Sequence, residues 1–151
     1  MKTTKIYSLT KNFCYMMVAA LMVVSVSSCA TKTKFLTSSV VPGAQGEVKV
    51  KKDNNKNYVI DVDINSLADP SRLQPAKNMY VVWMEGNDNK TQNMGQIKSS
   101  HSMMSKQMKG SFETVSPVSP KKIFITAEND ASIQYPNFAD IILTTDYIKQ
   151  K

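Results

Sequence analysis

The chain beyond position 44 alternates between apolar and polar side chains, the period-two pattern of half-buried β-strands. In the segment 58–65 Tyr58, Ile60, Val62 and Ile64 stand at even positions, and polar residues occupy positions 61, 63 and 65. The preceding segment 47–51 shows the same alternation, and the turn-forming sequence Asp53-Asn54-Asn55 separates the two. We therefore expect these segments to form a β-hairpin.

The same criteria predict five further strands and the turns between them. These strands are expected at Met79–Glu85, Gln92–Lys98, Gln107–Val115, Lys121–Glu128 and Ala139–Tyr147. The stretch Ser66–Asn78 contains two prolines, so we expect it to cross between sheets with one helical turn. Seven short strands separated by turn residues favour an all-β fold, an antiparallel, Ig-like β-sandwich over residues 45–148.

The first 28 residues have a different pattern. Three lysines precede an apolar run from Phe13 to Val24, which is typical of a signal-peptide helix and too short to span a bilayer. The sequence Val26-Ser27-Ser28-Cys29 follows and resembles the lipobox of bacterial lipoproteins. That resemblance implies cleavage before Cys29, a diacylglycerol on its thiol and an acyl chain on its new amino group. An ordinary cleavage site with Cys29 present by chance is the alternative.

The predicted mature chain runs from Cys29 to Lys151, with residues 29–44 expected to be a flexible tether. Its lysines and arginines exceed its acidic residues by only four and are scattered, so we expect no nucleic-acid partner. Cys14 is removed with the signal peptide, which leaves no thiol for a disulfide.

Because lysines rather than acidic residues follow Cys29, the expected location is the cell envelope, on the periplasmic face of the outer membrane.

A second resemblance involves the central strands. Tyr80-Val81-Val82-Trp83, then Gly95-Gln96-Ile97, then the strand 123–128, Pro136 and the apolar segment 141–143 follow one another in an order that resembles the extracytoplasmic domain of anti-sigma-K factors. The resemblance implies a β-sandwich with an envelope-sensing role. The helical domain that binds the sigma factor is missing here, so we expect no sigma-factor contact.

Two aromatic residues in this region lie an odd number of positions apart. Tyr80 and Trp83 must therefore point to opposite faces of one strand. Packing is the expected role of both, because aromatic side chains are usually buried. The alternative is that one is exposed for carbohydrate or protein contact.

One stretch carries residues suited to a soft metal. His101, Met103, Met104 and Met108 provide one imidazole and three thioethers, the ligands that Cu(I) prefers. A periplasmic copper-binding protein is therefore the alternative function. Methionine is also a common filler of irregular gaps, and the mature chain has only this histidine, so no metal or cofactor is the primary expectation.

Sequence patterns typical of catalytic sites are weak in this chain. Asp61 and Asp63 share one strand face, a spacing that acid–base pairs also use. However, polar and apolar residues alternate along this strand, as they do in any strand with one solvent-exposed face. The sequence has no nucleophile elbow or glycine-rich phosphate loop, so we expect a non-catalytic protein. The expected function is contact with an envelope protein or the cell wall through the loops Gly86–Thr91 and Lys98–Met108.

Overall fold

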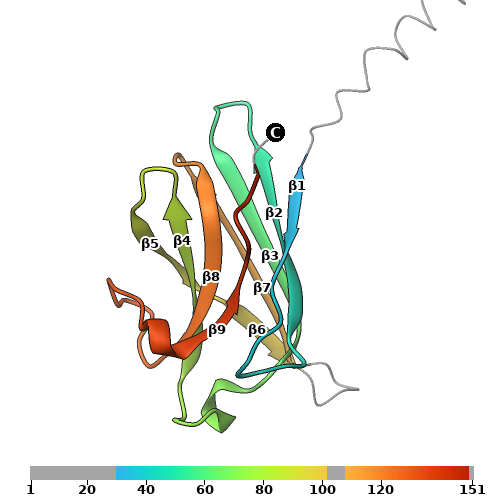
Figure 1. Cartoon of the computed structure of the whole chain (residues 1–151), viewed down its shortest axis with the longest axis vertical. Helices are drawn as coiled ribbons and strands as arrows, with labels where there is room; N and C mark the ends of the chain where they lie inside the picture. Colours follow the sequence, from blue (N-terminus) through green and yellow to red (C-terminus); the bar gives the residue numbers. More distant parts are fainter. Residues whose placement is uncertain (1–29, 102–107, 150–151) are drawn as a thin grey trace, which may run out of the picture.

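The computed structural model describes residues 30–101 and 108–149, which form an all-β sandwich of two antiparallel sheets (Figure 1). The strands are β1 (Thr31–Lys34), β2 (Gln45–Lys52), β3 (Tyr58–Leu67), β4 (Met79–Gly86), β5 (Thr91–Gln96), β6 (Lys98–His101), β7 (Met108–Ser116), β8 (Pro120–Glu128) and β9 (Ile141–Thr144). Two 3-10 turns, η1 (Pro70–Arg72) and η2 (Phe138–Asp140), are the helical elements of these ranges. In the part described, no helix has the length and apolar character needed to cross a membrane.

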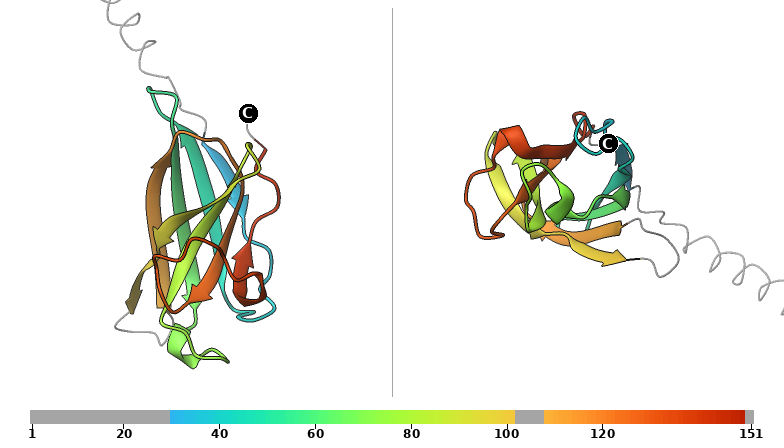
Figure 2. Two further views of the ribbon diagram at one scale, coloured as in Figure 1. Left: turned by 90° about the vertical axis from the view of Figure 1, so that its left-hand side faces the viewer. Right: turned by 90° about the horizontal axis from the view of Figure 1, so that it is seen from below.

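The strands fall into the two sheets in consecutive groups: β1–β3 and β6–β7 belong to one sheet, and β4–β5 and β8–β9 to the other. One sheet has the order β1-β2-β3-β7-β6, and the other has the order β5-β4-β8-β9. Between β5 and β6 only Ile97 intervenes, so this strand pair is nearly continuous and bends from one sheet into the other. Ile97 is buried at the corner, and its N–H donates to the Tyr80 carbonyl at 2.9 Å. Figure 2 shows the two layers from the side and from one end.

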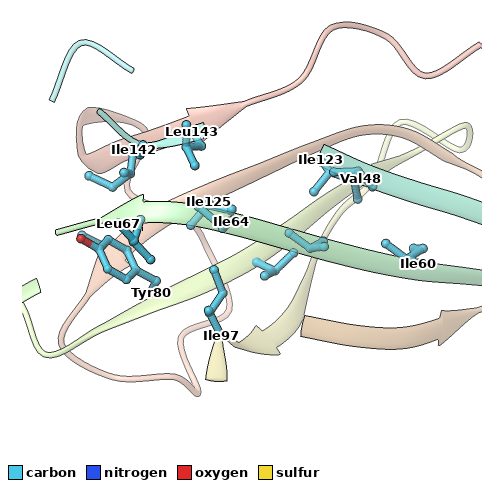
Figure 3. Close-up of a cluster of buried hydrophobic side chains, with 14 of the residues drawn as sticks. Val48, Ile60, Ile64, Leu67, Tyr80, Ile97, Ile123, Ile125, Ile142 and Leu143 are labelled. Carbon is cyan, nitrogen blue, oxygen red and sulfur yellow. The ribbon is translucent and has the colours of Figure 1, made fainter. Parts of the chain in front are cut away.

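The core fills the space between the sheets (Figure 3). Alternation places Ile60, Val62 and Ile64 of β3 inward, where each is at most 1% exposed. They meet Ile123 and Ile125 of β8 from the other sheet. Burial of an isoleucine or valine side chain contributes about 1.5–3 kcal/mol, so these facing rows hold the sandwich together.

The sequence correctly predicts the fold class, but the sandwich has nine strands rather than seven. The additional strands are β1 and β6. The predicted last strand, 139–147, is also too long, because η2 occupies its start and β9 ends at Thr144. The crossing 66–78 with one helical turn is confirmed, since η1 lies between β3 of one sheet and β4 of the other.

Residues 31–34, expected to belong to a flexible tether over 29–44, form strand β1 instead. Thr31 pairs with Val50, and the pairing continues to Lys34 opposite Glu47. The chain then passes to the other sheet, where the Leu36 N–H donates to the Thr144 carbonyl at 2.8 Å. Its Thr- and Lys-rich composition resembles that of a flexible linker, but an edge strand with one solvated face has the same composition.

Candidate functional site

The two aromatic residues of β4 occupy opposite faces, as predicted, and both are buried. Tyr80 is 2% exposed and lies in the core between the sheets, and Trp83 is 0% exposed on the outer face of the four-stranded sheet. The Trp83 Nε1–H donates to Thr126 Oγ1 at 2.8 Å. The alternative prediction of an exposed aromatic contact residue in this pair is therefore wrong.

The segment 129–140 between β8 and β9 packs over Trp83. Ile133 packs against the outer cluster of Val81, Trp83 and Phe124, and the Phe138 ring stacks on that of Phe124 with centroids 5.9 Å apart. The Asn93 side-chain amide on β5 donates to the carbonyls of Ala131 and Ile133 at 2.9 and 2.7 Å. We refer to residues 129–140 as the cover segment. It turns the outer face of this sheet into a second, smaller core.

The outer face of the five-stranded sheet carries charged residues instead. Lys49 of β2 lies among three carboxylates, with Nζ 2.7 Å from Asp63, 3.5 Å from Glu47 and 3.7 Å from Asp61. The hydrogen bond to Asp63 raises the pKa of Lys49, and the charges of all three carboxylates act in the same direction. The predicted Asp61–Asp63 pair thus forms an ion-pair cluster around one lysine. This arrangement favours a structural role over acid–base catalysis for the pair.

A polar groove of about 700 Å³ runs across this face, at the end where β2 begins and β3 ends. Every strand of the sheet contributes to it. Its lining residues are Lys34, Gln45, Gly46, Glu47, Asp63, Ile64, Asn65, Ser100, Lys109, Gly110 and Ser111. The groove therefore offers lysines, carboxylates, amides and hydroxyls, and no aromatic ring.

Gly46 is one of the residues that line the groove. A Cβ at this position would lie 2.4 Å from the Asp63 carbonyl oxygen, a distance that no real side chain tolerates. Because β2 and β3 pair directly here, the backbone itself would have to move. The close pairing of β2 and β3 beside the groove therefore requires glycine at position 46.

The predicted copper ligands do not come together as a described site. Met108 begins β7 and is buried in the hydrophobic core at 3% exposed. His101 ends β6 and pairs in register with Met108, and Met103 and Met104 lie outside the described residues. In residues 30–101 and 108–149, no group of three His, Cys, Asp or Glu side chains is placed to hold a metal ion.

The two predicted contact loops differ. Residues 87–90, which lie in the Gly86–Thr91 loop, are exposed at the tip of the β4–β5 hairpin. The stretch Lys98–Met108 begins with strand β6, so its first four residues are a sheet edge rather than a loop. The predicted lipidation residue, Cys29, lies outside the described residues, two positions before β1 begins.

Comparison with known proteins gives no match: no family model, no curated protein and no solved structure corresponds to this chain. The resemblances to lipoprotein signals and to anti-sigma-K factors therefore remain predictions from the sequence.

Sequence reasoning identified Asp61 and Asp63 but missed Lys49 and the groove. The signal for Lys49 is the hairpin itself, because a turn at 53–57 places position 49 opposite position 61. The groove has no such signal. Five chain segments, one from each strand of the sheet, form it, and their order in the sheet becomes known only from the fold.

Proposed function

We propose that this protein is a membrane-anchored envelope lipoprotein whose β-sandwich is a non-catalytic binding module. Lipid on Cys29 would hold it in the cell envelope, on the periplasmic face of the outer membrane. Two or more acyl chains give stable anchoring where one chain does not. The lipobox-like sequence supports the anchor, and the polar groove supports the binding role.

The anchor is tested by replacing its attachment residue. In Cys29→Ser, processing at this site and lipid addition are both expected to be lost, so the protein should leave the membrane fraction or retain its signal peptide. Mass spectrometry of the wild-type mature form should show a diacylglycerol and an N-acyl chain. Cys14→Ser is the matched control, and it should behave as wild type. A wild-type product without lipid would contradict the proposal.

The observation that carries the binding role is the composition of the groove. Carbohydrate sites commonly stack sugars on aromatic rings, and no aromatic residue lines this groove. Its amides, hydroxyls and charges of both signs suit the backbone and side chains of a polar peptide segment. We therefore favour a protein of the envelope over a cell-wall glycan as the partner.

Site-specific photo-crosslinking in intact cells tests this choice. A benzophenone amino acid in place of Ser111, inside the groove, is expected to give a discrete protein adduct. The same amino acid in place of Gln134, which is exposed on the cover segment of the other sheet, is the control. Equal adducts from both positions, or an adduct with glycan from Ser111, would contradict a protein partner in the groove.

Two further predictions from the sequence concern an envelope-sensing role and copper binding. The envelope-sensing role follows only from the anti-sigma-K resemblance, and an adjacent sigma-factor gene would favour it. Copper binding would have to proceed without Met108, because that thioether packs in the core. Cu(I) titration against a micromolar chelator would test it.

A further inference from the structure

Five parts of the chain meet at one end of the sandwich, which we call the anchor end. They are the start of β1, the hairpin loops β2–β3 and β4–β5, the β7–β8 turn, and residues 145–149 (Figures 1 and 2). Hydrogen bonds join three of these parts: the Asn87 N–H donates to the Ser119 carbonyl at 3.0 Å, and the Ile148 N–H donates to the Lys121 carbonyl, at the start of β8, at 2.9 Å. Thr31 lies beside Val50 at the end of β2.

Lysines are concentrated at the anchor end. It carries Lys51, Lys52, Lys56, Lys90, Lys121, Lys122 and Lys149 against Asp53, Glu85, Asp88 and Asp146. Lys121 is ion-paired with Glu85 at 2.7 Å, and among the described residues none of the other six takes part in an ion pair. Asp53 is occupied in its own turn, where its Oδ1 accepts from the N–H groups of Asn55 and Asn57.

The rest of the sandwich, towards the opposite end, has no such excess of lysine. Its charged residues include Lys34, Arg72, Lys77, Lys98 and Lys109 against Glu47, Asp63, Asp69, Glu128, Asp130 and Asp140. Lys77 is ion-paired with Asp140. Among the described residues the charges therefore nearly balance there, and the excess of positive charge lies at the end where β1 begins.

Tyrosine accompanies the lysines. Tyr147 is 66% exposed at the anchor end, with Lys121 Nζ 5.4 Å from its ring centroid. Lys52 Nζ lies 5.4 Å from the Tyr58 ring. Tyrosine and lysine are the residues that favour the boundary between water and lipid headgroups.

We propose that the anchor end docks on anionic phospholipid headgroups and thereby holds the sandwich in one orientation on the membrane. The proposal rests on the lipidation of Cys29, because that residue precedes β1 by two positions and brings this end to the lipid surface. Two extended residues span about 7 Å, which is within the Debye length of about 8 Å at physiological salt. The unpaired lysines therefore lie within reach of the negative surface potential. The groove, on a side face of the sandwich towards the other end, would then lie away from the membrane surface.

The test uses the mature lipidated protein in nanodiscs of phosphatidylcholine, with and without phosphatidylglycerol. Cys29 carries the lipid and no other cysteine remains, so Asn54→Cys at the β2–β3 tip accepts a fluorescent donor, with Ala76→Cys as the reference at the opposite end. Energy transfer to a headgroup acceptor reports the distance to the lipid. We expect phosphatidylglycerol to raise transfer from position 54 and not from position 76, and 0.5 M salt to abolish the increase.

The charge variant is Lys51→Gln, Lys52→Gln, Lys56→Gln and Lys122→Gln combined. The matched control removes four cations away from the anchor end: Lys34→Gln, Arg72→Gln, Lys98→Gln and Lys109→Gln. We expect the phosphatidylglycerol effect to be lost in the first variant and kept in the second. Equal transfer in both lipid compositions, or equal loss in both variants, would overturn docking while leaving the lipoprotein intact. Absence of the lipid mass on the purified protein would instead overturn the anchor, and docking with it.

Discussion

The hydrogen bond between Trp83 and Thr126 makes one hydroxyl group important for stability. Both side chains are 0% exposed, and the Trp83 Nε1–H has Thr126 Oγ1 as its acceptor. Thr126→Val keeps the shape and removes the acceptor, so we expect the free energy of unfolding to fall by about 1–3 kcal/mol. Urea unfolding followed by circular dichroism measures this loss. Thr91→Val, at an exposed position of β5, should change stability by less than about 0.5 kcal/mol, and equal losses would contradict the assignment.

Tyr80 should make the fold sensitive to high pH. Its hydroxyl donates to the Ala68 carbonyl at 3.0 Å, and burial, assisted by the charge of Asp69, raises its pKa to about 12. Because the folded pKa lies above the unfolded value of about 10, this contribution to stability is complete below pH 10 and is lost as the pH rises towards 12. The loss is about 1 kcal/mol by pH 11.

The variant Tyr80→Phe isolates this effect. At pH 7 it should lose about 0.5–1.5 kcal/mol with the hydrogen bond. Between pH 10 and 12 its stability should fall less steeply than that of wild type. The pKa values of Lys49 and Lys121 are also raised by their carboxylate partners. Both lysines titrate in wild type and in Tyr80→Phe, so their effect on stability cancels when the two pH profiles are compared. Parallel pH profiles would show that Tyr80 does not contribute.

Among the elements, the β2–β3 hairpin depends on close backbone contact at the groove. Gly46→Ala would place a Cβ 2.4 Å from the Asp63 carbonyl oxygen, so we expect a loss of about 1–3 kcal/mol or more and a deformed groove. Gly43→Ala is the matched control, because nothing lies within 4 Å of its added Cβ. Thermal unfolding compares the two. A Gly46→Ala protein as stable as Gly43→Ala would show that the hairpin can yield there.

The cover segment is an element held in place partly by one side-chain amide. Asn93→Asp keeps the size of the side chain but removes both N–H donors to Ala131 and Ile133. We expect faster hydrogen exchange in 129–140 and a red-shifted emission of Trp83, the only tryptophan. Gln92→Glu makes the same chemical change one position away. Unchanged exchange in Asn93→Asp would mean that apolar packing alone holds the segment.

Sequence patterns predict those elements whose two faces differ. Strand β3 is the clearest case, because one face is apolar and the other polar, and its hairpin partner follows from the turn at 53–55. Strands β1 and β6 have no apolar row: their sequences are Thr-Lys-Thr-Lys and Lys-Ser-Ser-His. Pairing with β2 and β7 makes them strands, and that pairing is a tertiary effect. The cover segment escaped prediction for the same reason.

At the scale of the whole molecule, the first seven described residues connect the two sheets. Strand β1 pairs with β2 in one sheet, and Phe35 bridges to Thr145 beside the other. If this segment is part of the fold, a protein that begins at Thr31 should keep full stability. A protein that begins at Thr37 should lose about 2–4 kcal/mol, chiefly from the packing of Phe35 against the core. Urea midpoints of the two truncations measure the difference.

The urea midpoints of these two truncated proteins also bear on the distance between the binding groove and the membrane. With β1 folded, two residues connect Cys29 to the sheet, about 7 Å of chain. A flexible tether through Gly43 would instead reach up to about 50 Å, and the charged anchor end would then have no fixed relation to the lipid. Equal midpoints for the two truncations would therefore favour a module that searches a volume around its anchor. A large loss in the shorter protein supports a module that presents its groove at a fixed height.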